Sequence, residues 1–411
     1  MNKKRPDHAP ITSFPVEHDE LVVGGMNIRQ LAAFAGQTPF YAYSREAIST
    51  RVAQLRRSLP DRISIHYAIK ANPMPAVVDH MAGLVDGLDV ASMRELHTAI
   101  ASGMDPAEIS FAGPGKSETE LASAIAAGAT LNIESPVELE RASVLSEQLG
   151  VRARVAIRVN PDFELKSSGM KMAGGAKQFG IDAEQVPEVL NRLKEMDLHF
   201  RGFHIFSGSQ NLQPDSLIEA QSATFDLAYR LSEDTPSRME VLNIGGGFGV
   251  PYFPGDLPLD LDPVSENLER LLAEAESRLP DTEVVIELGR YLVAEAGVYV
   301  CRVIDKKESR GQQFLVTDGG LHHHLAASGN FGQIIRKNYP VVNAHQVSQG
   351  ERETVSVVGP LCTPLDLLGD KMELGVAKIG DYVAVMQSGA YGFSASPHGF
   401  LSHPGPVEVL V

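Results

Sequence analysis

The segment HYAIKANP, residues 66–73, places a lysine where it could act as a nucleophile. Lys70 follows a run of strand-forming residues and precedes Ala-Asn-Pro, so we expect it at the carboxyl end of a strand. An amine can form a Schiff base when burial or a nearby cation disfavours its ammonium form. Spacing alone favours the alternative, an ordinary lysine that extends its ammonium group into solvent.

Other segments could supply partners for a single ligand. Glycines 245–249 of IGGGFG could offer backbone N–H groups to a phosphate, although a glycine cluster alone is more often a turn. Ser209 could donate a further hydrogen bond, and Glu287 and Arg290 of ELGR present a carboxylate and a guanidinium group. Together with Lys70, these groups suit the phosphate, pyridine nitrogen and aldehyde of pyridoxal phosphate.

The order of segments predicts how these residues are positioned. Short apolar runs alternate with helix-like stretches: ISIHYAI, GLDVAS, EISFAG, TLNIES, ARVAIRVN, RGFHIF, VLNIGGG and EVVIELG. One helical stretch opens with Ser135-Pro136, an N-cap followed by a first-turn proline. About eight strand–helix repeats in roughly 250 residues favour a closed (β/α)8 TIM barrel over an open sheet. Active sites of such barrels lie at the carboxyl ends of the strands.

The pattern becomes β-rich after residue 288, in YLVAEAGVYVCRVIDKKE, QQFLVTDGG, ETVSVVGPLC and DYVAVMQSGAY. We therefore expect an N-terminal segment, 1–37, whose ELVVGGMNI strand joins a C-terminal β domain, 285–411, with the barrel at 38–284.

Composition excludes several classes of protein. The net charge of −16 disfavours nucleic-acid binding, and no window has the roughly 18 uninterrupted apolar residues of a membrane span. Only Cys301 and Cys362 are cysteines, which fits a reducing, cytoplasmic location. GPGKS is not a phosphate loop because Ser110 occupies the position of its first glycine.

Several motifs together resemble a known family. HYAIKANP, GLDVAS, GSQ, IGGGFG, ELGR, GPLCTPLD and SGAY occur in the order seen in the fold-type III pyridoxal-phosphate decarboxylases, the diaminopimelate and ornithine decarboxylase superfamily. That superfamily has an alanine-racemase-like barrel and a C-terminal β domain. FAGPGKSETE, VNPDFELKSSGMKMAGGAKQFGID, FHIFSGSQNL and IGGGFGVPYFPGD more narrowly resemble the exosortase A (PEP-CTERM) system-associated decarboxylases. The resemblance covers nearly the whole chain.

The resemblance implies roles for individual residues. Lys70 is expected to hold pyridoxal phosphate through a Schiff base, and Glu287 to pair with the pyridine nitrogen. Asp89 is expected near the ring, with helix capping as its alternative. The phosphate is expected to contact Ser209, Gly245, Gly246, Gly247, Gly249, Arg290 and Tyr391, and Gly289 is expected among the other cofactor-binding residues.

One position departs from the family at the cofactor ring. Aligning Gly208-Ser209-Gln210 with the family motif places Phe206 where these enzymes carry a histidine that stacks on the pyridine. We expect Phe206 to cover one face of the cofactor. His204 shares that side of the strand one layer deeper, where it could order a polar group.

The resemblance also implies a homodimer with shared active sites. Cys362, taken alone a small buried hydrophobe, matches a cysteine that crosses from the partner subunit and reprotonates the α-carbon. Thr363 stands where enzymes for basic substrates have an acidic residue, and Ala326 where diaminopimelate enzymes have an arginine. Asp366 on the same loop could contact substrate. We therefore expect α-decarboxylation of an acidic or carrier-linked aminoacyl group.

Two other functions stay open at this point. A racemase needs bases on both faces of the cofactor, and racemases of this fold carry an arginine in place of Glu287. A catalytically idle homologue is disfavoured by Lys70, Cys362 and Tyr391. We expect no metal site, because His322-His323-His324, read as a strand, point to opposite faces.

Overall fold

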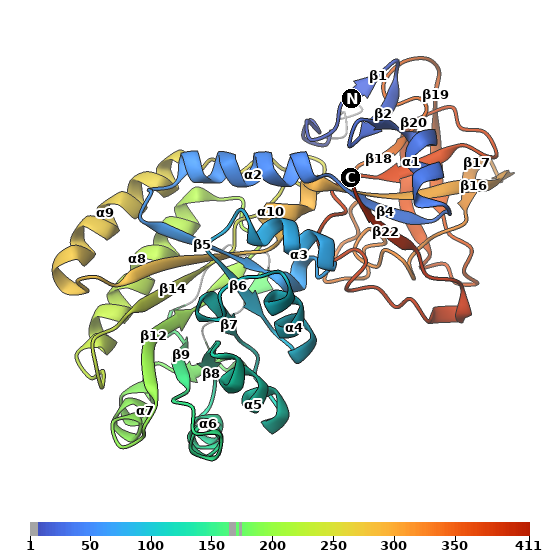
Figure 1. Ribbon diagram of the computed structural model, residues 1–411. Coiled ribbons are helices and arrows are strands. Elements are labelled where there is room, and N and C mark those ends of the chain that lie inside the picture. Colours follow the sequence, from blue (N-terminus) through green and yellow to red (C-terminus); the bar gives the residue numbers. More distant parts are fainter. Residues whose placement is uncertain (1–6, 164–169, 172–174) are drawn as a thin grey trace. The chain divides into compact units, whose positions relative to one another are not determined.

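The computed structural model describes residues 7–163, 170–171 and 175–411, which form two compact units. The barrel unit comprises residues 52–249 and 259–289, and the β unit comprises residues up to 51, 250–258 and 290–411 (Figure 1). The divisions after Arg51 and Gly289 differ from the expected ones after residues 37 and 284. The first difference arises because strand Phe40–Tyr43 (β4) pairs with strands of the β unit.

The barrel unit contains eight parallel strands that close on themselves, as predicted. In spatial order they are β9, β12, β14, β15, β5, β6, β7 and β8, and β8 pairs with β9 to close the ring. Each of the eight predicted segments contains one strand: β5 (Ile63–Ala68), β6 (Gly87–Val90), β7 (Ile109–Phe111), β8 (Thr130–Ile133), β9 (Arg154–Asn160), β12 (His199–Ile205), β14 (Val241–Gly246) and β15 (Glu283–Leu288). The short strand β11 (Ile181–Asp182) adds to β9.

Helices surround the strands of the barrel (Figure 1). They are α3 (Pro75–Ala82), α4 (Met93–Ala101), α5 (Glu118–Ala127), α6 (Pro136–Leu149), α7 (Val186–Leu193), α8 (Pro214–Ser232) and α9 (Asp262–Arg278), and α2 (Arg45–Ser58) crosses the boundary between the units. The predicted start of α6 is confirmed, since the Ser135 side chain accepts a hydrogen bond from the Glu138 N–H and Pro136 occupies the first turn. Leu139 and Ala142 of α6 are fully buried.

The interior of the barrel is unusually polar. Parallel strands covered on both faces normally carry apolar side chains, because burying an unpaired polar group destabilises the fold. Nine polar or charged side chains on the barrel strands are nevertheless buried: His66, Asp89, Thr130, Asn132, Arg158, Asn160, His204, Asn243 and Glu287. Such a concentration of buried titratable groups is typical of a functional site.

The β unit is built on one mixed sheet. It contains β18 (Val341–Asn343), β21 (Tyr382–Val385), β16 (Gly297–Ser309), β17 (Gln312–Thr317), β19 (Arg352–Val358) and β20 (Leu367–Gly375), and β4 joins it between β16 and β22 (Val407–Leu410). The C-terminal strand therefore lies beside a strand from residues 40–43. Short helical turns precede β16, at α10 (Arg290–Val293) and at residues 294–296.

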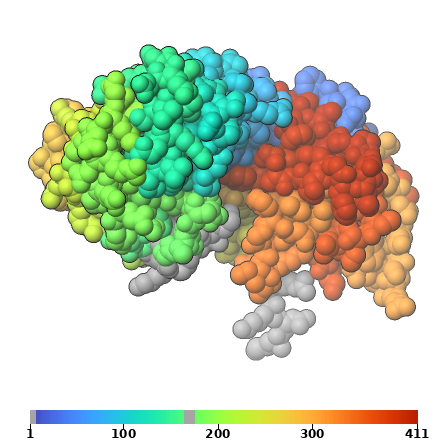
Figure 2. Space-filling model, turned by 90° about the horizontal axis from the view of Figure 1, so that it is seen from below, coloured from blue at the N-terminus to red at the C-terminus, as the bar shows by residue number. Residues whose placement is uncertain are grey.

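The N-terminal segment belongs to the β unit, but in a different way from that expected. ELVVGGMNI forms β2 (Glu20–Val23) and β3 (Met26–Asn27) of a separate three-stranded sheet with β1 (Val16–Glu17), followed by α1 (Ile28–Ala35). Leu21 and Ile28 pack in one core cluster with Val298 and Met386. Figure 2 accordingly shows blue N-terminal atoms beside the red C-terminal segment. Among the described helices, none is both long and apolar enough to cross a membrane.

Candidate active site

The HYAIKANP motif folds as the end of strand β5 and a 3-10 turn, and helix α3 begins after it at Pro75. Lys70 lies in a single 3-10 turn, residues 69–71, directly after β5. The Tyr67 hydroxyl donates to the Asn72 carbonyl oxygen at 2.9 Å, and the Asn72 side chain accepts the Met74 N–H at 3.1 Å. These bonds hold the backbone at the carboxyl end of the strand, while the Lys70 side chain remains 47% exposed.

Lys70 faces a buried carboxylate from the neighbouring strand. Its Nζ lies 3.6 Å from Oε1 of Glu287, whose side chain is only 6% exposed. The strands approach closely here, since a Cβ on Gly289 would lie 2.9 Å from the Cβ of Ala71. Gly289 therefore has a packing role at this site.

His204 and Arg158, together with Lys70, keep Glu287 ionised. His204 Nε2 lies 3.0 Å from Glu287 Oε2, and both side chains are almost completely buried. Burial by itself would raise the pKa of Glu287, but Lys70, His204 and Arg158 outweigh it and lower this pKa well below its ordinary value. The carboxylate is thus negatively charged at any physiological pH.

Asp89 lies on β6, the strand that pairs with β5, and its carboxylate is buried. Its Oδ1 accepts a hydrogen bond from the Ser110 hydroxyl at 2.5 Å and contacts His66 Nδ1 at 3.4 Å. Its Oδ2 is buried and has no hydrogen-bond partner among the described residues. The helix-capping alternative is wrong, because the following helix, α4, is capped by Ser92.

The glycines of IGGGFG permit close approaches that a larger residue would block. Gly245 and Gly247 have φ values of 69° and 81°, which favour glycine. A Cβ on Gly246 would collide with the carbonyl oxygen of Glu287, and one on Gly247 with that of Gly208. Gly249 donates its N–H to the Asn211 carbonyl oxygen at 2.9 Å. The loop is therefore held against the ends of β12 and β15.

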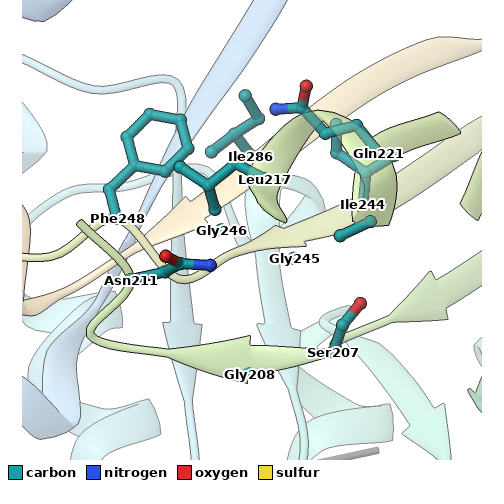
Figure 3. A pocket seen from close by; sticks show the side chains of 11 residues that line it. Ser207, Gly208, Asn211, Leu217, Gln221, Ile244, Gly245, Gly246, Phe248 and Ile286 are labelled. Carbon is teal, nitrogen blue, oxygen red and sulfur yellow. The ribbon is translucent and has the colours of Figure 1, made fainter. Parts of the chain in front are cut away.

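A small cavity of about 20 Å³ lies beside this loop. It is bordered by Gly245 and Gly246 on β14, by Ser207 and Gly208 after β12, and by Leu217 and Gln221 of α8 (Figure 3). Ser209 belongs to the two-residue strand β13 (Gly208–Ser209), whose backbone pairs with β10 (Met170–Lys171). Ser209 and the glycines are thus on adjacent loops, as the prediction requires.

Phe206 lies immediately after β12, close to Lys70. The centre of its ring is 5.9 Å from Lys70 Nζ, and a Cβ on Gly245 would lie 3.0 Å from the ring. His204, two residues earlier on β12, is buried, and the polar group that it contacts is Glu287. Stacking of Phe206 on a cofactor stays a prediction.

Arg290 and Tyr391 contact one another in the β unit. The Arg290 guanidinium carbon lies 4.7 Å from the centre of the Tyr391 ring, and Arg290 Nη1 donates to the Tyr252 hydroxyl at 3.3 Å. Burial would lower the pKa of Arg290, but Tyr252 and Tyr391 raise it above its ordinary value, so the group stays cationic. A cation paired with tyrosines rather than with a carboxylate can accept an anion such as phosphate.

The GPLCTPLD loop presents Cys362 at the surface of the β unit. Cys362 is an exposed free thiol, and the reading as a buried hydrophobe is wrong. Asp366 is 3% exposed and accepts backbone N–H groups from Leu321 at 2.6 Å and Leu361 at 2.8 Å, one on each carboxylate oxygen. Asp366 thereby anchors the loop, and a direct contact with substrate stays untested.

The histidine triplet lies in a turn, not in a strand as expected. His323 Nε2 contacts the Pro404 carbonyl oxygen and His324 Nε2 the Ser388 hydroxyl, both at 2.9 Å. Burial lowers the pKa of His322 to about 3, that of His323 to about 4 and that of His324 to about 3. Among the described residues, no set of three or more histidine, cysteine or acidic side chains is arranged for a metal ion.

Two residues of the site were missed at the level of sequence. Arg158 on β9 pairs with Glu134, Nη1 to Oε1 at 2.7 Å, and acts electrostatically on Glu287. Glu95 on α4 accepts the Ala91 N–H at 2.7 Å; burial raises its pKa and Lys70 opposes that rise. The signal for Arg158 was a charged residue inside the apolar strand ARVAIRVN, since an unpaired buried charge is very unfavourable.

The residues of the barrel fit pyridoxal phosphate. Lys70 offers an amine beside a buried, ionised carboxylate, the glycine loop forms a cradle that a Cβ would fill, and Asp89 has a buried oxygen with no partner in the described part of the chain. When bound, this cofactor supplies an electron sink that stabilises a carbanion after loss of carbon dioxide.

Comparison with known proteins agrees with this fit. The pyridoxal binding domain of the pyridoxal-dependent decarboxylases matches residues 45–294. The L-glutamyl-(BtrI acyl-carrier protein) decarboxylase of Niallia circulans is 40% identical over 384 residues, which cover 91% of this chain and 89% of the relative. Diaminopimelate decarboxylase of Aquifex aeolicus is 32% identical over 397 residues, 95% of this chain and 90% of the relative.

Solved structures lead to the same family. The crystal structure of diaminopimelate decarboxylase from M. jannaschii superposes with a TM-score of 0.88 at 26% identity, covering 97% of this chain and 93% of that one. It shares the barrel and the separate β domain. The chain therefore belongs to the pyridoxal-dependent decarboxylases, and is a pyridoxal-phosphate-dependent carboxy-lyase of the diaminopimelate decarboxylase type.

Proposed function

We propose that this decarboxylase acts on an aminoacyl group that is acidic or linked to a carrier protein, and not on a basic amino acid. The observation that carries the proposal is the composition of the loop around Cys362. Thr363 replaces the acidic residue, and its hydroxyl accepts the Leu365 N–H at 3.3 Å within the same loop. Both oxygens of Asp366 already accept backbone N–H groups. A distal ammonium group would meet no available carboxylate on this loop.

The position expected for a carboxylate-binding arginine supports the same proposal. Ala326 stands there and is buried. Arg336, further along the segment, donates from Nε to the Ser328 carbonyl oxygen, from Nη1 to Asn338 and from Nη2 to the Leu367 carbonyl oxygen. Because each of its three guanidinium nitrogens already donates a hydrogen bond within the fold, we do not expect Arg336 to replace the missing arginine. Free diaminopimelate is thus a poor candidate substrate.

Two of the named relatives are consistent with this reading. The Niallia circulans relative is named for an L-glutamyl group on an acyl-carrier protein. A Staphylococcus aureus relative, 31% identical over 386 residues, is named as a 2-((L-alanin-3-ylcarbamoyl)methyl)-2-hydroxybutanedioate decarboxylase. Both names describe larger acylated or acidic substrates rather than a free basic amino acid.

In this proposal each site residue has a distinct task. Lys70 attaches the cofactor, Glu287 pairs with the pyridine nitrogen, and Ser209, the glycine loop, Arg290 and Tyr391 bind its phosphate. Phe206 covers one face of the ring. Cys362 donates a proton to the α-carbon after carbon dioxide leaves.

An exposed group of side chains supports the proposed homodimer. Phe331, Ile334, Ile335 and Leu365, here called the apolar patch, are exposed on the β unit. Ile334 and Leu365 line one cavity of about 270 Å³, and Leu365 is three residues from Cys362. Exposed apolar patches commonly mark interaction sites. A second copy seated here would contact the Cys362 loop, because Leu365 belongs to both the patch and the loop.

Release of carbon dioxide from a substrate panel tests the proposed substrate. The panel contains meso-diaminopimelate, ornithine, lysine, free glutamate and a glutamyl group attached to an acyl-carrier protein. We expect the carrier-linked or acidic compounds to give the highest kcat/KM. Efficient turnover of meso-diaminopimelate or ornithine without turnover of the acidic compounds would contradict the proposal.

Two finer assignments remain predictions. The free thiols of Cys301 and Cys362 agree with a cytoplasmic location. The four long motifs that resemble the exosortase-associated decarboxylases are the reason for proposing that the chain belongs to that subgroup.

A further inference from the structure

Four neighbouring strands of the barrel each contribute one polar side chain to a continuous chain of contacts. His66 on β5 contacts Asp89 on β6, Nδ1 to Oδ1 at 3.4 Å. Ser110 on β7 donates its hydroxyl to the same oxygen at 2.5 Å, and Asn132 on β8 donates Nδ2 to the Ser110 hydroxyl at 3.1 Å. His66 and Ser110 therefore both contact Oδ1 of Asp89, and Asn132 supports the Ser110 hydroxyl.

The barrel provides space for the His66 ring. His66 is the register partner of Gly87 on β6, and of Glu287 on β15. A Cβ on Gly87 would collide with the His66 imidazole and with the Glu108 carbonyl oxygen. Because any larger residue at Gly87 would displace the ring, the glycine and the histidine form a matched pair.

His66 also borders a cavity on the side away from Lys70. The cavity measures about 30 Å³ and is lined by His66, Ser110, Asn132, Arg201 and Glu283, among others. That volume holds one or two water molecules. His66 Nε2 is buried and has no hydrogen-bond partner among the described residues. The imidazole thus lies between a polar cavity and Asp89.

The groups around His66 favour its protonated form. Three carboxylates act on it: Asp89 on β6, Glu283 on β15 and Glu108, the last residue of the 3-10 turn before β7. Arg201 on β12 also lines this cavity and contributes a cationic side chain to it. Burial lowers the pKa of His66, but the three carboxylates outweigh it, and the pKa is raised above its ordinary value.

We propose that His66 is a positioning residue for Asp89. It binds Oδ1 together with Ser110 from inside the barrel, so that Oδ2 remains directed to a ligand bound at the carboxyl ends of the strands. The inference rests on the proposed contact between Asp89 and the cofactor. His66 itself touches neither cofactor nor substrate.

A first experiment needs no cofactor. The imidazole of His66 is titrated by NMR in the apoprotein, in the wild type and in D89N. We expect a titration midpoint above the ordinary value of 6.5 in the wild type, and a clear fall in D89N, since the largest of the attractive carboxylate interactions is removed. Equal midpoints in the two proteins would overturn the pairing.

A second experiment measures the affinity of the apoprotein for pyridoxal phosphate as a function of pH. H66Q is compared with H97Q, a matched change of an exposed histidine on α4. We expect H66Q to bind at least about tenfold more weakly at pH 7, because a hydrogen bond to a charged group is lost. Wild-type affinity should fall as the pH rises through the raised midpoint of His66, and H66Q should lack this dependence.

The double variant H66Q/D89N separates the possible failures. If His66 acts through Asp89, the double variant binds the cofactor no more weakly than D89N alone. If H66Q equals H97Q in affinity and pH dependence while D89N binds weakly, the positioning role is wrong and the role of Asp89 stands. If D89N binds as tightly as the wild type, the role of Asp89 and this inference are both wrong.

Discussion

Lys70, in the turn that follows β5, lies beside Glu287 on the adjacent strand β15, with Lys70 Nζ 3.6 Å from Glu287 Oε1. Strands β5 and β15 pair in register, His66 with Glu287 and Tyr67 with Leu288, so Lys70 lies four residues beyond the register partner of Glu287. This relationship brings the group proposed to attach the cofactor and the group proposed to pair with its pyridine nitrogen to the same end of the barrel.

Replacing Lys70 with alanine should abolish covalent attachment of pyridoxal phosphate. Borohydride reduction followed by peptide mass spectrometry should label Lys70 in the wild type and no lysine in K70A, whose visible cofactor absorbance should also disappear. The exposed Lys194, replaced by alanine, is the control and should leave both signals intact. A label found on another lysine in wild-type protein would disprove the assignment.

Glu287→Gln should lower kcat at least about a hundredfold, in line with the loss of one electrostatic partner in an active site. The amide cannot keep a ring nitrogen protonated and no longer attracts Lys70 or His204. Rates of carbon dioxide release for E287Q and E287D decide the point, since aspartate retains the charge and should recover part of the activity. A rate for E287Q within threefold of wild type would argue against the role.

Thr363→Asp should improve activity on basic amino acids. A carboxylate after Cys362 offers a partner to a distal ammonium group, and a gain of about 1.4 kcal/mol corresponds to tenfold in kcat/KM. We therefore expect kcat/KM for ornithine to rise about tenfold in T363D, and that for acidic substrates to fall. Thr363→Asn, of similar size but neutral, is the control and should produce neither change.

The buried histidine triplet should make the protein less stable in acid. The lowered pKa values of His322, His323 and His324 mean that the unfolded chain binds protons more readily than the folded chain. Their contribution is therefore complete above about pH 6.5 and is lost as the pH falls toward 4, by at most about 1.4 kcal/mol per pH unit for each histidine.

Urea denaturation between pH 7.5 and 5 measures this effect. His322→Gln should reduce the slope of unfolding free energy against pH by about one proton, whatever its effect on stability at pH 7.5. His97→Gln on the exposed surface of α4 serves as the control. An unchanged slope in H322Q would show that the buried imidazole does not titrate on unfolding.

The apolar patch should hold two copies together. Ile334→Asp introduces a charge at a fully exposed isoleucine and should shift the protein from dimer to monomer in light scattering, with loss of carbon dioxide release. Ile379→Asp, at an isoleucine that is 63% exposed outside the patch, is the control. Mixing K70A with C362A should restore part of the activity if sites are shared. A monomeric, fully active wild type would refute the homodimer.

Much of the architecture could be read from local patterns. Each barrel strand is a short apolar run between turn residues, and each glycine or lysine of the site lies at the end of such a run. Strand order and the closed barrel follow from repetition of one unit, so Lys70, Ser209, Gly245 and Glu287 were predicted together. The order of motifs was sufficient to indicate the family.

The remaining features depend on contacts between residues far apart in sequence. The strand at 40–43 belongs to the β unit because of hydrogen bonds to β16 and β22, which its own composition does not reveal. Asp366 anchors the Cys362 loop through N–H groups of Leu321 and Leu361, although its motif suggested a substrate contact.

The sequence by itself determined which residues stand at the strand ends, since that depends on short-range periodicity and turn chemistry. Only the tertiary structure decided that His204 and Arg158 act on Glu287, and that His66 contacts Asp89. The physical reason is register: strands distant in the chain must pair at one specific offset before buried charges meet at interaction distance, and that offset is set by packing of the whole barrel.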